Sequence, residues 1–181
     1  MKLALFTLSL ALALTACGKA KEAVSQKVAE KVIETAINKD GSKSQVKLAN
    51  NGMSVSTTDA SGQTSTAEIG NAKITEAEVG VAFYPGAQTK EGESYRMQSP
   101  DGSQFRIGLH SADALDKVNS FYQEKLKALS AGRQMSSADN GDGTLMLMLI
   151  DNRDNSALQL VLQKADKGTD ISITSATGKK K

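Results

Sequence analysis

The sequence predicts an α+β fold, in which an antiparallel sheet carries one packed helix and is preceded by an N-terminal amphipathic helix and a polar β-meander. Three observations predict it. Apolar and polar residues alternate with period two in several short stretches, turn signals such as Asn-Gly and Asp-Gly separate these stretches, and a broad apolar stripe of helical period covers residues 112–131. Within the sheet we expect a two-stranded hairpin, then the helix, then a four-stranded meander.

The first segment in chain order, residues 1–16, has the pattern of a secretory signal peptide. Lys2 forms the positively charged n-region, and an apolar run of about a dozen residues follows, interrupted only by Thr7 and Ser9. Because a bilayer-spanning helix needs about 20 apolar residues, a permanent transmembrane helix is the weaker interpretation. We therefore expect residues 1–16 to be cleaved.

The single cysteine, Cys17, ends the window Leu14-Thr15-Ala16-Cys17. This window resembles the lipobox of bacterial lipoproteins. The resemblance implies that Cys17 becomes the first mature residue, with a diacylglyceryl group on its sulfur and an acyl chain, such as palmitate, on its amino group. Two or more such chains anchor a protein stably, since each buried methylene contributes about 0.8 kcal/mol. In enteric-type sorting Gly18 in place of aspartate implies the outer membrane, facing the periplasm, although Lys19 weakens this in other lineages.

Residues 17–41 combine this lipid anchor with a predicted amphipathic helix over 20–38. Its apolar residues recur at helical spacing: Val24, Val28, Val32 and Ala36, with Ala29, Ile33 and Ile37 beside them. Valine and isoleucine are mediocre helix formers, so the helix needs a surface to dock on. That surface is the protein's own sheet, the membrane beside the lipid, or a partner helix; Glu22, Glu30 and Glu34 argue against an anionic membrane. Asn38 to Gly41 should end the helix.

Residues 42–78 are predicted to form a polar β-meander with strands near 45–49, 53–58 and 63–69, separated by Asn-Gly and Ser-Gly turns. Such strands bury little by themselves, because few of their residues are apolar: Val46, Leu48, Met53, Val55 and Ile69. The meander therefore either extends another sheet or covers a partner. A flexible linker rich in serine and threonine is the alternative.

The α+β domain over residues 79–176 should hold the main core. Its strands are predicted at 79–83, 93–99, 103–109, 133–137, 144–150, 157–164 and 170–174. Tyr84-Pro85-Gly86-Ala87 is a type II turn signature. Ser111 should cap the helix over 112–131, and Gly132 should stop it. Residues 145–150 are all apolar, which predicts a central strand covered on both faces, and residues 177–181 form a basic tail.

The order of these features resembles a domain of uncharacterised bacterial lipoproteins and secreted proteins. The likeness covers residues 80–175 and rests on the run 81–87, on the helix start Ser111-Ala112-Asp113 and on Phe121-Tyr122. Arg133 departs from that pattern, in which an aromatic residue follows Gly132. The resemblance implies a strand-strand-helix-strands fold and no known activity.

Composition narrows the classes of function. Without residues 1–16 the chain has 21 basic and 20 acidic residues, since Lys2 is the only charge removed from the 22 and 20 of the full sequence. Such near-neutrality gives no reason to expect a nucleic acid as partner. With Cys17 acylated no thiol remains, so we expect no disulfide, no thiolate metal site and no cysteine nucleophile.

Candidate catalytic and metal-binding residues are few. His110 is the only histidine, and Asp113 or Asp116 could orient it, but no nucleophile or pocket is marked beside it. The loop 139–143, Asp-Asn-Gly-Asp-Gly, fails the EF-hand pattern because Ala138 falls at the first ligand position. Met146 and Met148 are expected to be core residues and not copper ligands. We therefore expect no enzymatic activity, no metal site and no cofactor.

Two functions remain as hypotheses. The first is a non-enzymatic envelope lipoprotein, bound to a membrane through Cys17, with a structural or protein-interaction role toward another envelope protein. The second is a carrier of a small apolar ligand or lipid in a cavity between sheet and helix, suggested by the surplus of leucine and methionine over residues 144–164. An enzyme with an unrecognised site ranks third.

Overall fold

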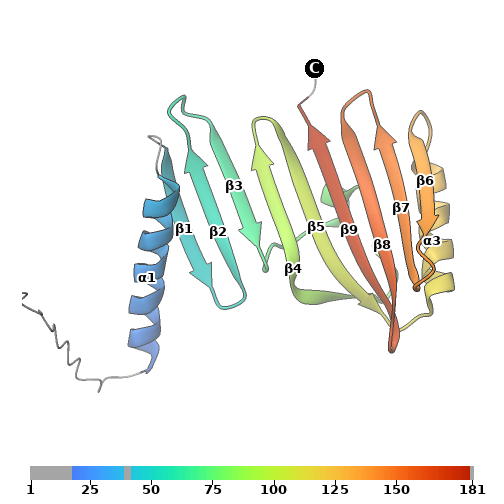
Figure 1. Ribbon diagram of the computed structural model, residues 1–181, viewed down its shortest axis with the longest axis horizontal. Coiled ribbons are helices and arrows are strands. Elements are labelled where there is room, and N and C mark those ends of the chain that lie inside the picture. The colour runs from blue at the N-terminus through green and yellow to red at the C-terminus, as the bar shows by residue number, and fades with distance from the viewer. Residues whose placement is uncertain (1–17, 39–41, 180–181) are drawn as a thin grey trace, which may run out of the picture.

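A computed structural model describes residues 18–38 and 42–179 (Figure 1). The predicted signal peptide 1–16, Cys17, Gly41, Lys180 and Lys181 lie outside the described residues. The helices are α1 (Gly18–Ile37), α2 (Glu76–Val79) and α3 (Leu115–Leu129). The strands are β1 (Lys43–Ala49), β2 (Gly52–Thr58), β3 (Thr64–Ile69), β4 (Gln88–Ser99), β5 (Gly102–Ser111), β6 (Gln134–Asp139), β7 (Thr144–Asp151), β8 (Ser156–Ala165) and β9 (Gly168–Gly178).

All nine strands join one antiparallel sheet in the order β1-β2-β3-β4-β5-β9-β8-β7-β6. The chain leaves β5, crosses through α3 to the far edge at β6, and returns through β7 and β8 so that β9 pairs with β5 (Figure 1). The α+β prediction with an antiparallel sheet is confirmed, as is the hairpin of β4 and β5. The strand count differs, since the meander of residues 43–69 extends the same sheet and residues 79–83 form no strand.

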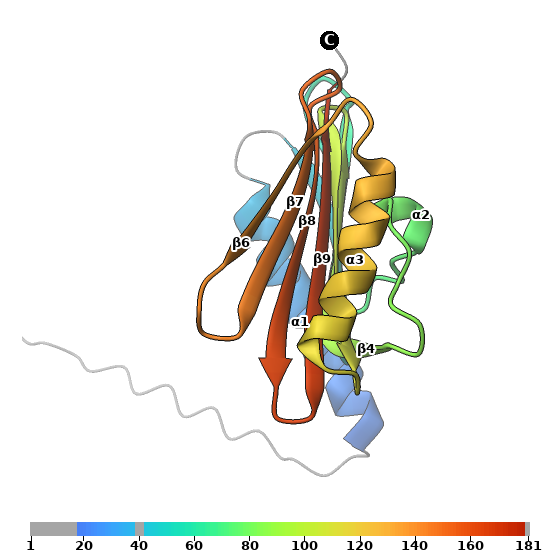
Figure 2. The ribbon, with the colours of Figure 1, turned by 90° about the vertical axis from the view of Figure 1, so that its right-hand side faces the viewer.

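The core lies on one face of the sheet, beneath α2 and α3 (Figure 2). The stripe of α3 is the one expected from the sequence: Val118, Tyr122 and Leu126 recur every four residues and are 0% exposed. Opposite this helix the register aligns buried residues of neighbouring strands in rows, such as Ile107, Ile173, Leu160 and Leu147. This face therefore provides the main apolar burial of the fold.

The opposite side of the sheet, which we call the open face, carries neither α2 nor α3 (Figure 2). In β7 Leu147 and Leu149 are buried on the core face, whereas Met146, Met148 and Ile150 on the open face are only half-buried. The prediction that residues 145–150 are covered on both faces is therefore wrong. The open face of β7 is not covered because α1, the remaining helix, lies along β1 at the other end of the sheet (Figure 1).

The connection from β3 to β4 replaces the strand predicted at 79–83 with a short helix and a loop. A capping box starts α2: the Glu78 N–H donates to Thr75 Oγ1 at 3.3 Å, and the Thr75 N–H donates to Glu78 Oε2 at 2.8 Å. Gly80 ends the helix with a positive φ of 74°. The apolar residues that suggested a strand are still buried, Val79 and Val81 among them. The predicted turn is present, with the Ala87 N–H donating to the Tyr84 carbonyl at 3.0 Å.

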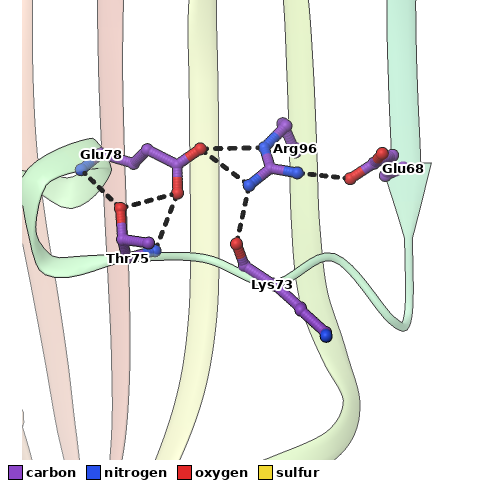
Figure 3. A network of polar contacts seen from close by, with 5 residues as sticks. All are labelled: Glu68, Lys73, Thr75, Glu78 and Arg96. Atoms are coloured by element: carbon purple, nitrogen blue, oxygen red, sulfur yellow. Dashed lines mark hydrogen bonds and ion pairs between the residues drawn. The ribbon is translucent and has the colours of Figure 1, made fainter.

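Arg96 of β4 joins the meander to the rest of the fold (Figure 3). Its guanidinium donates to Glu68 of β3 at 2.6 Å, to Glu78 of α2 at 2.7 and 3.0 Å, and to the Lys73 carbonyl at 2.7 Å. Burial opposes ionisation of Glu78, but hydrogen bonds from Thr75 and Arg96 outweigh it and lower the pKa of this carboxyl group. Residues 43–69 are therefore strands held in register with the core, in place of the alternative flexible linker.

The start of α3 also differs from the prediction. Ala114 is the N-cap residue and makes no side-chain capping hydrogen bond. Ser111 instead accepts a hydrogen bond from the Asp113 N–H at 3.1 Å, within the turn before the helix. The prediction of Ser111 as the cap is thus wrong because the helix begins at Leu115, three residues later than expected.

Candidate functional site

The predicted lipid-attachment residue Cys17 lies outside the described residues, and the described chain begins directly after it. Gly18 is the first residue of α1. The helix is therefore adjacent in sequence to the predicted lipid. Within residues 18–38 and 42–179, no helix is long and apolar enough to cross a membrane.

A row of polar side chains attaches α1 to the free edge of β1. The backbone N–H groups of Ser44, Val46 and Leu48 donate to Asn38 Oδ1 at 2.7 Å, to Glu34 Oε1 at 3.0 Å and to Glu30 Oε1 at 2.8 Å. Acceptors four residues apart on a helix are separated by about 6.0 Å, and donors two residues apart on a strand by about 6.6 Å. The two spacings match closely enough for one side chain to meet each N–H group. We call this arrangement the edge ladder.

The edge ladder satisfies donors that an edge strand would otherwise present to solvent or to another strand. Glu34 also accepts from Lys31 Nζ at 2.7 Å, and the hydrogen bonds from Lys31 and from the Val46 N–H lower the pKa of the Glu34 carboxyl group. It therefore stays ionised at neutral pH. This role was not predicted from the sequence, although acceptors at 30, 34 and 38 that face alternate residues of a following strand are a recognisable signal.

Three valines of the apolar stripe of α1 do not pack on the sheet, whereas Ala29 and Ile33 are half-buried. Val24, Val28 and Val32 are 64%, 59% and 64% exposed. With Lys27, Lys31 and Thr35 they line a shallow, open groove on the outer side of the helix. The interpretation that this stripe docks on the protein's own sheet is wrong for these three valines, because α1 is attached through the edge ladder.

The open face presents apolar side chains in two zones. One zone lies on β2 to β4 and includes Met53, Val55, Ile69, Tyr95 and Met97, of which Ile69 and Met97 are 41% and 37% exposed. The other lies on β7 and β8 and includes Met146, Met148, Ile150 and Val161, all half-buried. Between them the register places polar side chains, among them Arg106, Thr174 and Gln159. Methionine adapts well to partner surfaces, and both methionine and tyrosine are enriched at protein interfaces.

Met146 and Met148 therefore lie on the open face. The expectation that they are core residues is wrong. Met146 Sδ accepts a hydrogen bond from Gln159 Nε2 at 3.3 Å. The leucines of the same strands do lie in the core, where Leu147, Leu160 and Leu162 are at most 1% exposed. These leucines fill the space under α3 instead of lining a cavity.

His110 lies in a charged cluster, with a different carboxylate from the two considered in the sequence. Its Nδ1 is 2.8 Å from Asp170 Oδ1, across the pair of β5 and β9. Asp170 also accepts from Lys90 Nζ at 2.8 Å, and Lys90 is 2.9 Å from Glu93. The hydrogen bond from Lys90, followed by that from His110, lowers the pKa of the Asp170 carboxyl group. The expectation that Asp113 or Asp116 orients His110 is wrong.

Asp113 has other partners: it accepts from Tyr84 Oη at 2.7 Å and from Lys117 Nζ at 2.9 Å. No hydroxyl is hydrogen bonded to His110 among the contacts that the described residues make. The His110 cluster therefore pairs charges at the end of the sheet without the nucleophile and base arrangement that acyl transfer requires.

The loop 139–143 forms the turn between β6 and β7. Asp139 Oδ1 accepts from the Gly141 N–H at 2.8 Å, and Asp142 Oδ1 accepts from the Thr144 N–H at 2.9 Å. These carboxylates are used to shape the turn. In the described part of the chain, no three His, Cys, Asp or Glu side chains come together as a metal-binding group.

Comparison with family models, with curated proteins and with solved structures finds no match for this chain. The candidate site therefore rests on the molecule's own features: the predicted lipid at Cys17, the exposed stripe of α1 and the open face of the sheet.

Proposed function

We propose that this protein is a lipid-anchored lipoprotein of the bacterial cell envelope that binds another envelope protein through the open face of its sheet, without catalytic chemistry. Anchoring rests on the resemblance of residues 14–17 to a lipobox. The binding role rests on one observation, the apolar side chains that β2 to β4 and β7 to β8 present on a sheet face that neither α2 nor α3 covers. By resemblance, the location is the periplasmic side of the outer membrane.

The open face suits a protein partner because apolar and polar side chains alternate across it. Tyr95 donates from its hydroxyl to Met97 Sδ at 3.2 Å, and Arg106 donates to Ser172 Oγ at 3.3 Å. Aromatic, methionine and arginine side chains are enriched where proteins meet. A broad, open sheet face fits a partner surface better than it fits a small ligand, which is usually held in a concave pocket.

A carrier of a small apolar ligand was the alternative. The leucines that suggested it are packed under α3, so no observation on the described residues favours that function over protein binding.

Two experiments test the proposal. For the anchor, cells are labelled with an alkyne analogue of palmitate, and the wild type is compared with Cys17→Ser. We expect the wild type to carry the label and to sediment with membranes, and the variant to lose both. A label of equal intensity on the variant would contradict lipid attachment at Cys17.

For binding, a photo-crosslinking amino acid is placed at Tyr95 or Met148 on the open face and, as a matched control, at the exposed Gln123 on α3. We expect a discrete crosslinked product with an envelope protein from Tyr95 and Met148 but not from Gln123. Crosslinking only from Gln123, or from none of the three at native expression, would contradict the proposed interaction surface.

A further inference from the structure

The outer side of α1 combines apolar and positively charged residues. Val24, Val28 and Val32 are exposed along it, and Lys27 and Lys31 line the same shallow groove. From Val24 to Ile37 the helix has two acidic residues, Glu30 and Glu34. Which way these two carboxylates point therefore decides the charge of the outer side.

Both carboxylates point toward β1. Glu30 and Glu34 accept hydrogen bonds from the Leu48 and Val46 N–H groups, and the Glu34 side chain is only 14% exposed. Val28 and Val32 each precede one of these glutamates by two residues. Because residues two apart on a helix project about 160° from one another, the valines face away from the edge ladder. The objection that glutamates disfavour an anionic surface thus no longer applies to Glu30 and Glu34, since these two are not on the side that the valines occupy.

The position of α1 in the chain indicates which surface the outer side of the helix contacts. The helix begins at Gly18, directly after the predicted lipidated residue. Its first turn must then lie within a few ångströms of the lipid headgroups. Three valines alone would bind a bilayer weakly, but the acyl chains keep them at the membrane at high effective concentration.

We propose that α1 lies flat on an anionic bilayer surface, with Val24, Val28 and Val32 inserted at the headgroup boundary. Lys27 contacts anionic headgroups, and Lys31, whose ammonium group also pairs with Glu34, adds positive charge beside it. This inference rests on the proposed function, because the lipid on Cys17 brings the helix to the membrane. Since the edge ladder is on the opposite side of α1, the sheet stands upright on the membrane. Successive strands are about 4.8 Å apart, which places β6 about 40 Å from β1 and leaves the open face exposed at the side of the upright sheet.

The test uses the mature lipidated protein, in which Cys17 is acylated and an introduced cysteine is the only free thiol. An environment-sensitive fluorophore (NBD) is attached to Val28→Cys or, as a control, to Gln123→Cys on α3. Each protein is reconstituted in vesicles of 30% phosphatidylglycerol and 70% phosphatidylethanolamine, with or without a spin-labelled lipid as quencher. We expect blue-shifted and quenched emission at position 28 and water-like, unquenched emission at position 123.

A second part of the experiment varies the charge of the helix and of the vesicles. Replacing Lys27 with Gln should reduce the ratio of inserted to free α1 about fivefold, since a cationic residue near an anionic surface contributes about that factor. Vesicles of phosphatidylcholine alone should reduce it further. Equal insertion in all these cases would overturn the role assigned to the lysines.

The outcomes separate this inference from the function it rests on. If the protein floats with the vesicles but the fluorophore at position 28 stays in water, the anchor stands and the helix orientation is overturned. If the protein does not float, both are overturned. If position 28 becomes protected without lipid, in proportion to protein concentration, a second copy of the chain covers the stripe, and the membrane assignment is overturned.

Discussion

The backbone N–H of Val46 in β1 donates to Glu34 Oε1 of α1 at 3.0 Å. A second such bond joins Leu48 to Glu30 of the same helix, and a third joins Ser44 to Asn38, directly after the helix. An edge strand usually exposes a row of N–H groups that can pair with another chain. Here a helix that begins next to the predicted lipid accepts those hydrogen bonds instead. The same contact turns the valines of α1 outward.

The first prediction concerns this edge ladder. Replacing both Glu30 and Glu34 with Ala removes two acceptors, while alanine keeps the helix propensity at least as high. We expect the amides of Val46 and Leu48 to exchange with deuterium at least about tenfold faster, because their acceptors are lost. The control Glu124→Ala on α3, which lies far from the edge ladder, should leave both amides unchanged. Unaltered exchange in the double variant would show that α1 is held by other contacts.

The second prediction concerns a buried hydrogen bond between the loop and α3. The Tyr84 N–H donates to Tyr122 Oη at 3.0 Å, and burial raises the pKa of the Tyr122 hydroxyl, so it stays protonated. Tyr122→Phe leaves a buried donor without an acceptor, which costs about 1–3 kcal/mol in the free energy of unfolding. Tyr84→Phe loses a bond to the partly exposed Asp113 and should cost less. Urea unfolding of both variants checks the order; a reversed order would contradict it.

The third prediction tests the assignment of the two sheet faces. Leu160 is 0% exposed on the core face, whereas its neighbour Val161 is half-buried on the open face. Leu160→Ala should lower the free energy of unfolding by about 2–5 kcal/mol, and Val161→Ala by about 1.5 kcal/mol or less. Equal losses in thermal or urea unfolding would mean that both faces of β8 are covered.

The fourth prediction is a pH dependence at Asp151. This buried carboxylate accepts hydrogen bonds from Arg153 at 2.6 and 2.9 Å, which lower its pKa well below the usual range. A lowered folded-state pKa stabilises the fold above the unfolded-state pKa, about 3.9, and that contribution is lost as pH falls through the folded-state value. The stability gap between the wild type and Asp151→Asn should thus be largest near pH 7 and shrink below about pH 4. The measurement is the Tm of both proteins at a series of pH values. A difference in Tm between the wild type and the variant that stays constant from pH 7 to pH 2 would contradict this prediction.

The elements with strong periodicity were predictable from sequence, and those fixed by specific polar contacts were not. The stripe Val118, Tyr122 and Leu126 identified α3, because its period matches the helix that buries it. The alternating residues Val79 and Val81 suggested a strand, but the capping box of Thr75 and Glu78 makes the segment a helix end. Local hydrogen bonding decided what apolar spacing could not.

The site shows the same division. The outward valines of α1 were visible in the sequence, but their exposure depends on how Glu30 and Glu34 engage a strand that follows in the chain. The partner of His110 was missed because Asp170 lies 60 residues away and meets it only through the pairing of β5 with β9. Long-range strand pairing is the information that a single sequence carries least clearly.

The central claim is that the protein is held at a membrane by lipid on Cys17. Mass spectrometry of the N-terminal peptide of the protein purified from cell membranes tests it most directly. We expect a peptide that begins at Cys17 and carries the mass of a diacylglyceryl group plus one further acyl chain. A mature protein that begins at another residue, or an unmodified Cys17, would contradict the account.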